Sequence, residues 1–129
     1  MRFRFVIEPR GGTGPSVREI LAKASENPLV LTLEGKPGEI IVFCNSKEEL
    51  DHQRQRFQET GTISSSLCTL TIDEFGVRVN QECKEESRAR MKGFVQWILS
   101  EFGPCQVLDD ETGEDISELA SRDARVLFG

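Results

Sequence analysis

The first residues of the chain alternate between apolar and polar side chains. Every second position is apolar, at Met1, Phe3, Phe5 and Ile7. The positions between them are Arg2, Arg4, Val6 and Glu8. Successive side chains of a strand point to opposite faces of a sheet, so a period of two is typical of a strand with one buried face. Residues 1–8 are therefore predicted to form the first strand.

Two segments begin with the pattern of a capping box, in which a serine is followed three residues later by a glutamate. Ser16 with Glu19 opens the first, and Ser46 with Glu49 opens the second. The serine side chain satisfies a free N–H group of the first helical turn, so this spacing marks the start of a helix. The first helix is predicted to end before Asn27-Pro28, and the second, more polar one to run to about Glu59 and lie on the surface.

The segment 85–102 carries the strongest helical pattern in the chain. Its apolar residues recur at steps of three and four, as expected for one face of a helix. These residues are Met91, Phe94, Val95, Ile98, Leu99 and Phe102. Gly103-Pro104 supplies the punctuation that ends such a helix. We predict that this is the principal core helix.

The remaining apolar runs are short and rich in β-branched residues, which favours strands over helices. Gly and Pro at 35–38 separate the first pair of runs, and Asp73-Glu74 separates the second, so each pair is predicted to form an antiparallel hairpin. The predicted strands cover residues 29–33, 39–44, 63–72, 75–81 and 105–108. A brief terminal helix is expected at 116–120, and the apolar tail at 124–128 is expected to dock on the body.

Hairpins that alternate with helices favour an α+β fold over a doubly wound parallel sheet. We predict a mostly antiparallel sheet with about three helices packed on one face. The length of 129 residues matches one ordinary domain, and neither an internal repeat nor a linker interrupts the sequence. Residues 1–129 are therefore expected to form a single α+β domain.

Composition and net charge exclude several classes of function. The net charge is −6 at pH 7, so the chain lacks the positive surface that supplies most of the affinity for nucleic acids. No run approaches the ~18 consecutive apolar residues of a membrane span, and the N-terminus has no signal-peptide core. We expect a cytoplasmic protein that binds neither nucleic acid nor membrane.

The four cysteines and the single histidine do not have the spacing of a metal site. Cys44, Cys68, Cys83 and Cys105 are widely spaced, whereas structural zinc sites usually take ligands in close pairs. In a cytosolic protein the expected state is four reduced thiols that behave as small hydrophobic residues. Neither a metal nor a cofactor is predicted.

Several motifs resemble catalytic sequences but lack the residues that the chemistry requires. The turn at 11–14, Gly-Gly-Thr-Gly, has neither the lysine of a P-loop nor the glycine spacing of a dinucleotide site. His52 lies on the most polar predicted helix without a nucleophile nearby in the sequence, and the serines at 64–66 lack the glycine-flanked turn of an esterase. Asp73-Glu74-Phe75-Gly76 is similar to the metal-binding motif of kinases, but the rest of the kinase signature is missing. A hairpin turn accounts for these residues. The chain is therefore not expected to be an enzyme.

The most unusual segment follows the last predicted strand and contains no basic residue. Its candidate partner-binding residues are Asp109, Asp110, Glu111, Glu114, Asp115 and Glu118. Gly113 is the fifth residue counted from Asp109, whereas an EF-hand loop has its glycine at the sixth position, so a calcium site is not indicated. Clustered carboxylates raise the rate of encounter with a basic partner, although a solvated turn that caps a helix would have the same composition.

The segment 88–118 resembles bacterial immunity proteins of polymorphic-toxin systems. The likeness rests on the helix Phe94-Val95-Gln96-Trp97-Ile98-Leu99, on the strand Cys105-Gln106-Val107-Leu108 and on the acidic residues 109–115 in a small acidic chain. The resemblance implies a cytoplasmic inhibitor that covers the basic active-site cleft of a cognate toxin. Two alternatives remain open: a small nucleotide-binding enzyme that uses the turn at 11–14, and a structural adaptor of a phage or secretion apparatus.

Overall fold

The computed structural model describes residues 4–9, 17–35, 38–73, 76–101, 105–118 and 127. The helices and strands follow the order that the sequence predicts: strand, helix, two strands, helix, two strands, helix, strand. They are β1 (Arg4–Pro9), α1 (Val17–Ala24), β2 (Val30–Glu34), β3 (Glu39–Phe43), α2 (Lys47–Thr60), β4 (Thr69–Asp73), β5 (Gly76–Asn80), α3 (Glu85–Glu101) and β6 (Cys105–Asp109).

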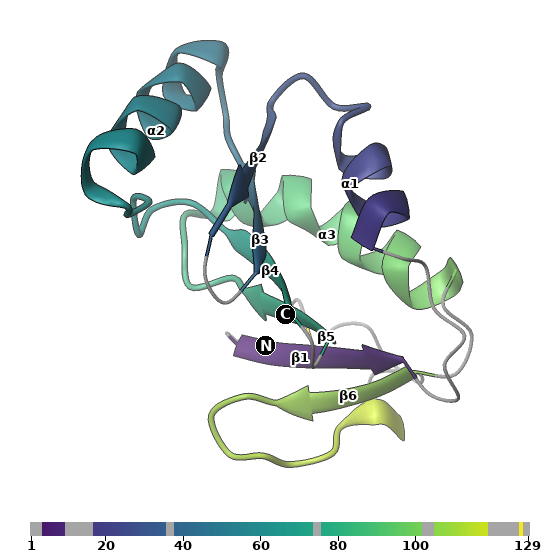
Figure 1. Cartoon of the computed structure of the whole chain (residues 1–129). Coiled ribbons are helices and arrows are strands. Elements are labelled where there is room, and N and C mark those ends of the chain that lie inside the picture. The colour runs from purple at the N-terminus through teal and green to yellow at the C-terminus, as the bar shows by residue number, and fades with distance from the viewer. Residues whose placement is uncertain are drawn as a thin grey trace.

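The strands form a six-stranded sheet in the order β2-β3-β4-β5-β1-β6, and each neighbouring pair is antiparallel. The first strand of the sequence thus lies inside the sheet, between β5 and β6 (Figure 1). Gly76 at the start of β5 has φ +142°, and a Cβ there would lie 2.3 Å from the Ile7 carbonyl oxygen, so this close approach requires glycine. The predicted α+β fold with an antiparallel sheet is confirmed.

One face of the sheet carries the main core, which α1 and α3 cover. Side chains at alternate strand positions, such as Phe5 and Ile7 of β1, point to this face. Ile20 of α1 and the Met91 and Val95 side chains of α3 pack against them with almost no exposure. The periodicity that predicts a core helix at 85–102 therefore identifies the face of α3 that is buried.

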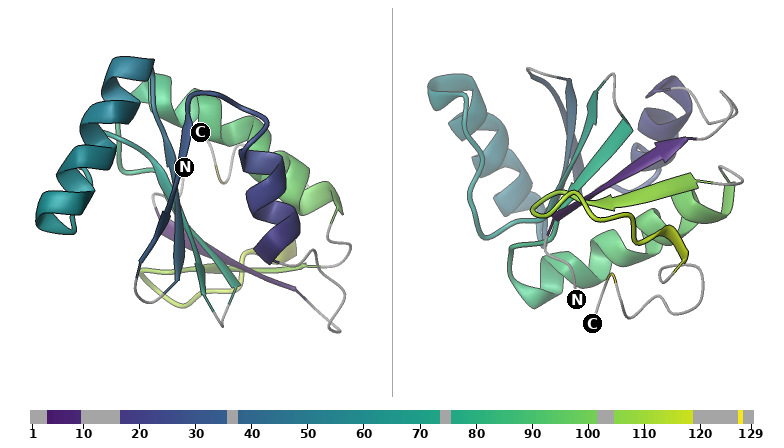
Figure 2. Two further views of the ribbon diagram at one scale, coloured as in Figure 1. Left: turned by 45° about the horizontal axis from the view of Figure 1, so that its top comes forward. Right: turned by 90° about the horizontal axis from the view of Figure 1, so that it is seen from below.

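The helix α2 lies against the opposite face of the sheet, next to β2 and β3 (Figure 2, left). Its Leu50 belongs to a second cluster with Leu31, Val42 and Cys44, whose side chains alternate with those of the main core. This arrangement differs from the prediction of three helices on one face. The physical reason is that β3 is apolar at consecutive positions, so both of its faces need a covering layer.

The strand β4 begins at Thr69, six residues later than predicted. Residues 63–68 instead form a turn in which the Leu67 N–H donates to the Ser64 carbonyl and the Ser66 N–H donates to the Ser64 hydroxyl. Serine side chains offer the backbone such local partners in place of a strand ladder. Gln53 of α2, which is buried, accepts a hydrogen bond from the Ser64 N–H at 2.9 Å and fixes the turn against the helix.

A disulfide joins Cys68 to Cys83, so the expectation of reduced thiols is wrong for these two residues. Their Cα atoms lie 5.3 Å apart, within the usual range for a disulfide. The register of the β4–β5 hairpin pairs Thr69 with Asn80, which brings the residues just outside both strands together. Sequence spacing alone does not reveal this proximity.

Leu127, the described residue of the predicted apolar tail at 124–128, lies in the core. Leu127 is fully buried in the main core, and its carbonyl accepts a hydrogen bond from the Gln81 side chain. Of the terminal helix predicted at 116–120, the structure describes residues 116–118, of which Ser117 and Glu118 are helical and Ile116 is buried but not helical. Within the described ranges, none of the helices combines the length and the apolar character that crossing a bilayer requires.

Candidate functional site

The predicted acidic segment folds into a hairpin that turns back along β6. We call residues 109–118 the acidic hairpin. The Asp109 N–H donates to the Glu114 carbonyl at 2.8 Å, and the Ile116 N–H donates to the Val107 carbonyl at 2.8 Å. Gly113 at the turn has φ +75°, a conformation that favours glycine. The carboxylates that are contiguous in sequence are therefore distributed over a defined backbone shape.

Two carboxylates of the acidic hairpin hold its backbone. The Asp109 side chain is buried, and its Oδ1 accepts hydrogen bonds from the N–H groups of Glu111 at 2.9 Å and Thr112 at 3.2 Å. Asp115 is exposed, but its Oδ1 accepts from both the N–H and the hydroxyl of Ser117. Charge-assisted bonds of this kind stabilise a turn, so these two residues have a structural role.

Asp110, at the base of the acidic hairpin, faces an arginine of the neighbouring sheet. Its Oδ1 lies 2.8 Å from Nη1 of Arg78, whose Nε lies 2.8 Å from the Asp73 carboxylate. The Asp73 side chain is only 3 % exposed, so the guanidinium also compensates a buried charge. The positive charge of Arg78 thus compensates the negative charge of Asp110 at the point where the acidic hairpin leaves β6.

The other predicted partner-binding residues lie at the surface. Glu111, Glu114 and Glu118 are all exposed. The structure therefore separates the six predicted residues into two groups: three whose contacts hold or balance the hairpin, and three that are exposed at its surface. Their role in partner binding stays a prediction.

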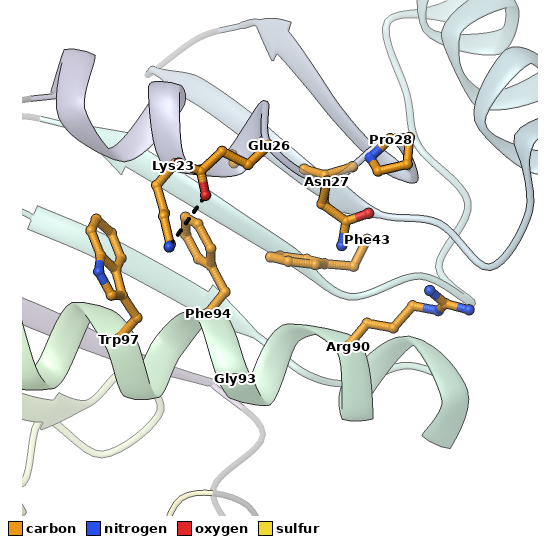
Figure 3. Close-up of a pocket in the computed structure, with 11 residues that line it drawn as sticks. Lys23, Glu26, Asn27, Pro28, Phe43, Arg90, Gly93, Phe94 and Trp97 are labelled. Atoms are coloured by element: carbon orange, nitrogen blue, oxygen red, sulfur yellow. Dashed lines mark ion pairs between the residues drawn. The ribbon is translucent and has the colours of Figure 1, made fainter.

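A pocket between α1 and α3 is a second candidate site, and the sequence did not predict it. Its volume is about 430 Å³, and Figure 3 shows a row of aromatic side chains along its floor. The ring centroids of Phe43 and Phe94 lie 5.8 Å apart, and those of Phe94 and Trp97 lie 5.7 Å apart. We call this cavity the α1–α3 pocket. Phe94 and Trp97 are only partly buried because part of each ring faces it.

Two basic side chains border this aromatic row: Lys23 lies beside Trp97 and Phe94, and Arg90 lies beyond the other end of the row (Figure 3). The ammonium of Lys23 lies 3.3 Å from the Glu26 carboxylate and 5.5 Å from the Trp97 ring centroid. Arg90 is exposed and makes no ion pair with any residue that the structure describes. The periodicity of the core helix assigned Phe94 to the core and left Arg90 unassigned, so only the packing of α1 over α3 reveals the pocket.

The remaining candidates for chemistry among the described residues are metal ligands, His52 and the free thiol of Cys44. The described residues contain no group of three or more His, Cys, Asp or Glu side chains that could hold a metal ion. His52 is exposed on α2, as predicted. Burial, with a smaller contribution from the Glu49 carboxylate, raises the pKa of the Cys44 thiol to about 11, which disfavours the nucleophilic thiolate. The glycine turn at 11–14 lies outside the described residues.

Comparisons with protein-family models, with curated proteins and with solved structures find no match to this chain. A functional proposal therefore depends on the two surfaces described above. Of these, the acidic hairpin lies beside the last sheet strand, and the α1–α3 pocket lies near the opposite edge at β2.

Proposed function

We propose that this protein is a non-enzymatic inhibitor of the immunity-protein kind, which binds a cognate bacterial toxin in the cytoplasm and covers a basic active-site cleft. The observation that supports this proposal is the acidic hairpin, in which Glu111, Glu114 and Glu118 are exposed on a backbone held by internal hydrogen bonds. The resemblance of residues 88–118 to immunity proteins agrees with it.

The internal bonds of the acidic hairpin matter for affinity. Ordering a loop on binding costs free energy that subtracts from the interaction with the partner. Asp109 and Asp115 fix the backbone before the partner arrives, so this cost is small. The outer carboxylates then act as a preformed negative surface that a basic cleft complements.

The charge of the acidic hairpin is expected to act mainly on the rate of association. Electrostatic steering raises association rates by ~10- to 10³-fold, and salt screens it over a Debye length of ~8–10 Å at physiological ionic strength. An inhibitor that must reach a toxin before damage occurs benefits from such a rate. The three exposed glutamates should therefore determine how fast the complex forms and how strongly that rate depends on salt.

The test begins with a toxin domain encoded next to this chain. Co-expression of the two proteins should restore growth, and the purified pair should bind in a kinetic assay. A variant with Glu111→Gln, Glu114→Gln and Glu118→Gln should associate about 10-fold more slowly at low salt and show a weaker salt dependence. The carboxylates of Asp109, Asp110 and Asp115, whose contacts hold or balance the hairpin, stay in place.

A matched control distinguishes the effect of where the carboxylates lie from the effect of the net charge on the association rate. Glu34, Glu48 and Glu59 are exposed and lie outside the acidic hairpin, and their replacement by glutamine removes the same number of negative charges. This control should slow association much less. Equal rates for the two triple variants would show that the hairpin is not the binding surface. A failure of the wild-type chain to restore growth or to bind the adjacent toxin would refute the inhibitor function itself.

A further inference from the structure

Gly93 lies in the interior of α3, where the fold gives no steric reason for a glycine. A Cβ built at this position meets no other atom within 4 Å, and Gly93 is not among the glycines with positive φ. Glycine is less favourable than alanine in a helix interior, because it loses more conformational freedom on folding. The residue lines the α1–α3 pocket. Its effect is to keep this wall of the pocket free of side-chain atoms.

The volume and the mainly apolar lining of the α1–α3 pocket lie in the range of small-molecule sites. A volume of about 430 Å³ lies within the ~300–1,000 Å³ of typical ligand pockets, which are mainly apolar with a few polar groups. The rings of Phe43, Phe94 and Trp97 form a continuous apolar floor. Ala24 and Val30 extend the apolar lining towards α1 and β2. Such a floor favours a ligand with an aromatic or branched aliphatic body.

The charges around the α1–α3 pocket favour an anion. Glu26 compensates Lys23, whereas Arg90 has no ion-pair partner among the described residues. The pocket therefore carries an excess positive charge on a protein whose net charge is −6. A guanidinium presents paired N–H donors that match the two oxygens of a carboxylate.

We propose that the α1–α3 pocket binds a small organic carboxylate with an aromatic or branched aliphatic body. The body lies against the partly exposed rings of Phe94 and Trp97, and the carboxylate pairs with Arg90 (Figure 3). Gly93 leaves the space that the ligand occupies. This site is independent of the acidic hairpin and of any toxin.

Trp97 provides a direct measurement of binding. It is the only tryptophan of the chain, which contains no tyrosine, and it lines the α1–α3 pocket. The probe is 4-phenylbutanoate, and its neutral amide serves as the comparison ligand. A carboxylate of this size is expected to produce a saturable change in tryptophan fluorescence with a dissociation constant on the order of 1 mM. The amide should bind about 10-fold more weakly or not at all.

Two variants test the proposed contacts. Arg90→Gln should weaken binding of 4-phenylbutanoate about 10-fold or more, to the level of the amide. Lys47→Gln is its matched control, because it removes an exposed positive charge from α2 on the opposite face of the sheet and should leave the affinity unchanged.

Gly93→Leu should change stability and binding in opposite directions. Leucine is a better helix former than glycine, so the Tm should rise by a few degrees, while the side chain occupies the pocket and abolishes saturable binding. Gln96→Leu adds the same side chain at an exposed position of α3 outside the pocket lining and should retain binding. Circular dichroism verifies that each variant is folded.

Three results would overturn the proposal. They are the absence of a saturable response of the wild-type protein to 4-phenylbutanoate, equal affinities for the carboxylate and the amide, and undiminished binding by Arg90→Gln. Because Arg90 is exposed, its replacement is not expected to unfold the protein, so this variant remains informative if Gly93→Leu does not fold.

Discussion

Reduction of the Cys68–Cys83 disulfide should lower stability without unfolding the protein. The bond closes a loop of 15 residues that contains the β4–β5 hairpin. Both ends of this loop are also held by hydrogen bonds. The Cys68 N–H donates to the Ser87 hydroxyl at 2.8 Å, and the Cys83 carbonyl accepts from Arg88 at 2.8 Å. We therefore expect the native contacts to survive reduction and the main effect to fall on the unfolded chain.

The expected loss follows from the entropy of loop closure. Cross-linking a loop of 15 residues restricts the unfolded ensemble by about 3 kcal/mol. With a urea m-value of about 2 kcal/mol/M, the midpoint of unfolding should fall by about 1.5 M. Domains are usually stable by about 5–15 kcal/mol, so the reduced chain is expected to stay folded in native buffer. A cytoplasmic inhibitor would need that property, because cytosolic thiols are kept reduced.

The assay is a urea titration followed by Trp97 fluorescence and by circular dichroism, with and without a phosphine reductant. The variant Cys83→Ser should match the reduced wild-type protein and should not respond to the reductant. Cys44→Ala should retain the full response, because Cys44 lies outside the disulfide. If the wild-type midpoint is unchanged although a thiol assay shows complete reduction, the loop-closure argument is refuted.

Three further predictions test local features. Asp109→Ala should lower the free energy of unfolding by about 1–3 kcal/mol, because two backbone N–H groups of the turn lose a buried acceptor; Glu111→Ala should change it by less than about 0.5 kcal/mol in the same denaturation assay. Cys44 keeps its proton to higher pH in the folded protein, since burial and, secondarily, Glu49 raise its pKa from 9.0 to about 11. Its contribution to stability is therefore complete below pH 9 and is lost as the pH rises to about 11, so Cys44→Ala should reduce the decline seen in denaturation at alkaline pH. Gly61→Ala should lower the Tm, with a loss of about 1 kcal/mol, because Gly61 has φ +70° at the end of α2; an unchanged Tm would contradict this.

The elements that the sequence predicted well depend on local physics. The capping box of α2 forms as expected, with the Glu49 N–H donating to the Ser46 hydroxyl, and the Glu49 carboxylate accepts from the neighbouring Asn45 N–H. The β2–β3 hairpin and the buried face of α3 follow from spacings of two and of three or four. These features involve residues close in sequence, so pattern and propensity are sufficient to predict them.

The acidic segment shows where composition stops being informative. Its carboxylates are similar in the sequence, but Asp109 points inward and Asp110 meets Arg78, which comes from a strand 32 residues earlier. The sheet order, which places β1 between β5 and β6, brings Asp110 to Arg78. The position of an acid along the chain does not reveal whether its charge reaches a partner.

The sequence by itself determined the order of the elements, the α+β class and the identity of the core helix, because each rests on a local periodicity. The tertiary structure decided that α2 covers the second face of the sheet, that Cys68 meets Cys83, and that Arg90 and Trp97 border one pocket. Each of these outcomes joins segments that are distant in sequence. Their proximity is set by strand register and by helix packing, and no local pattern encodes either.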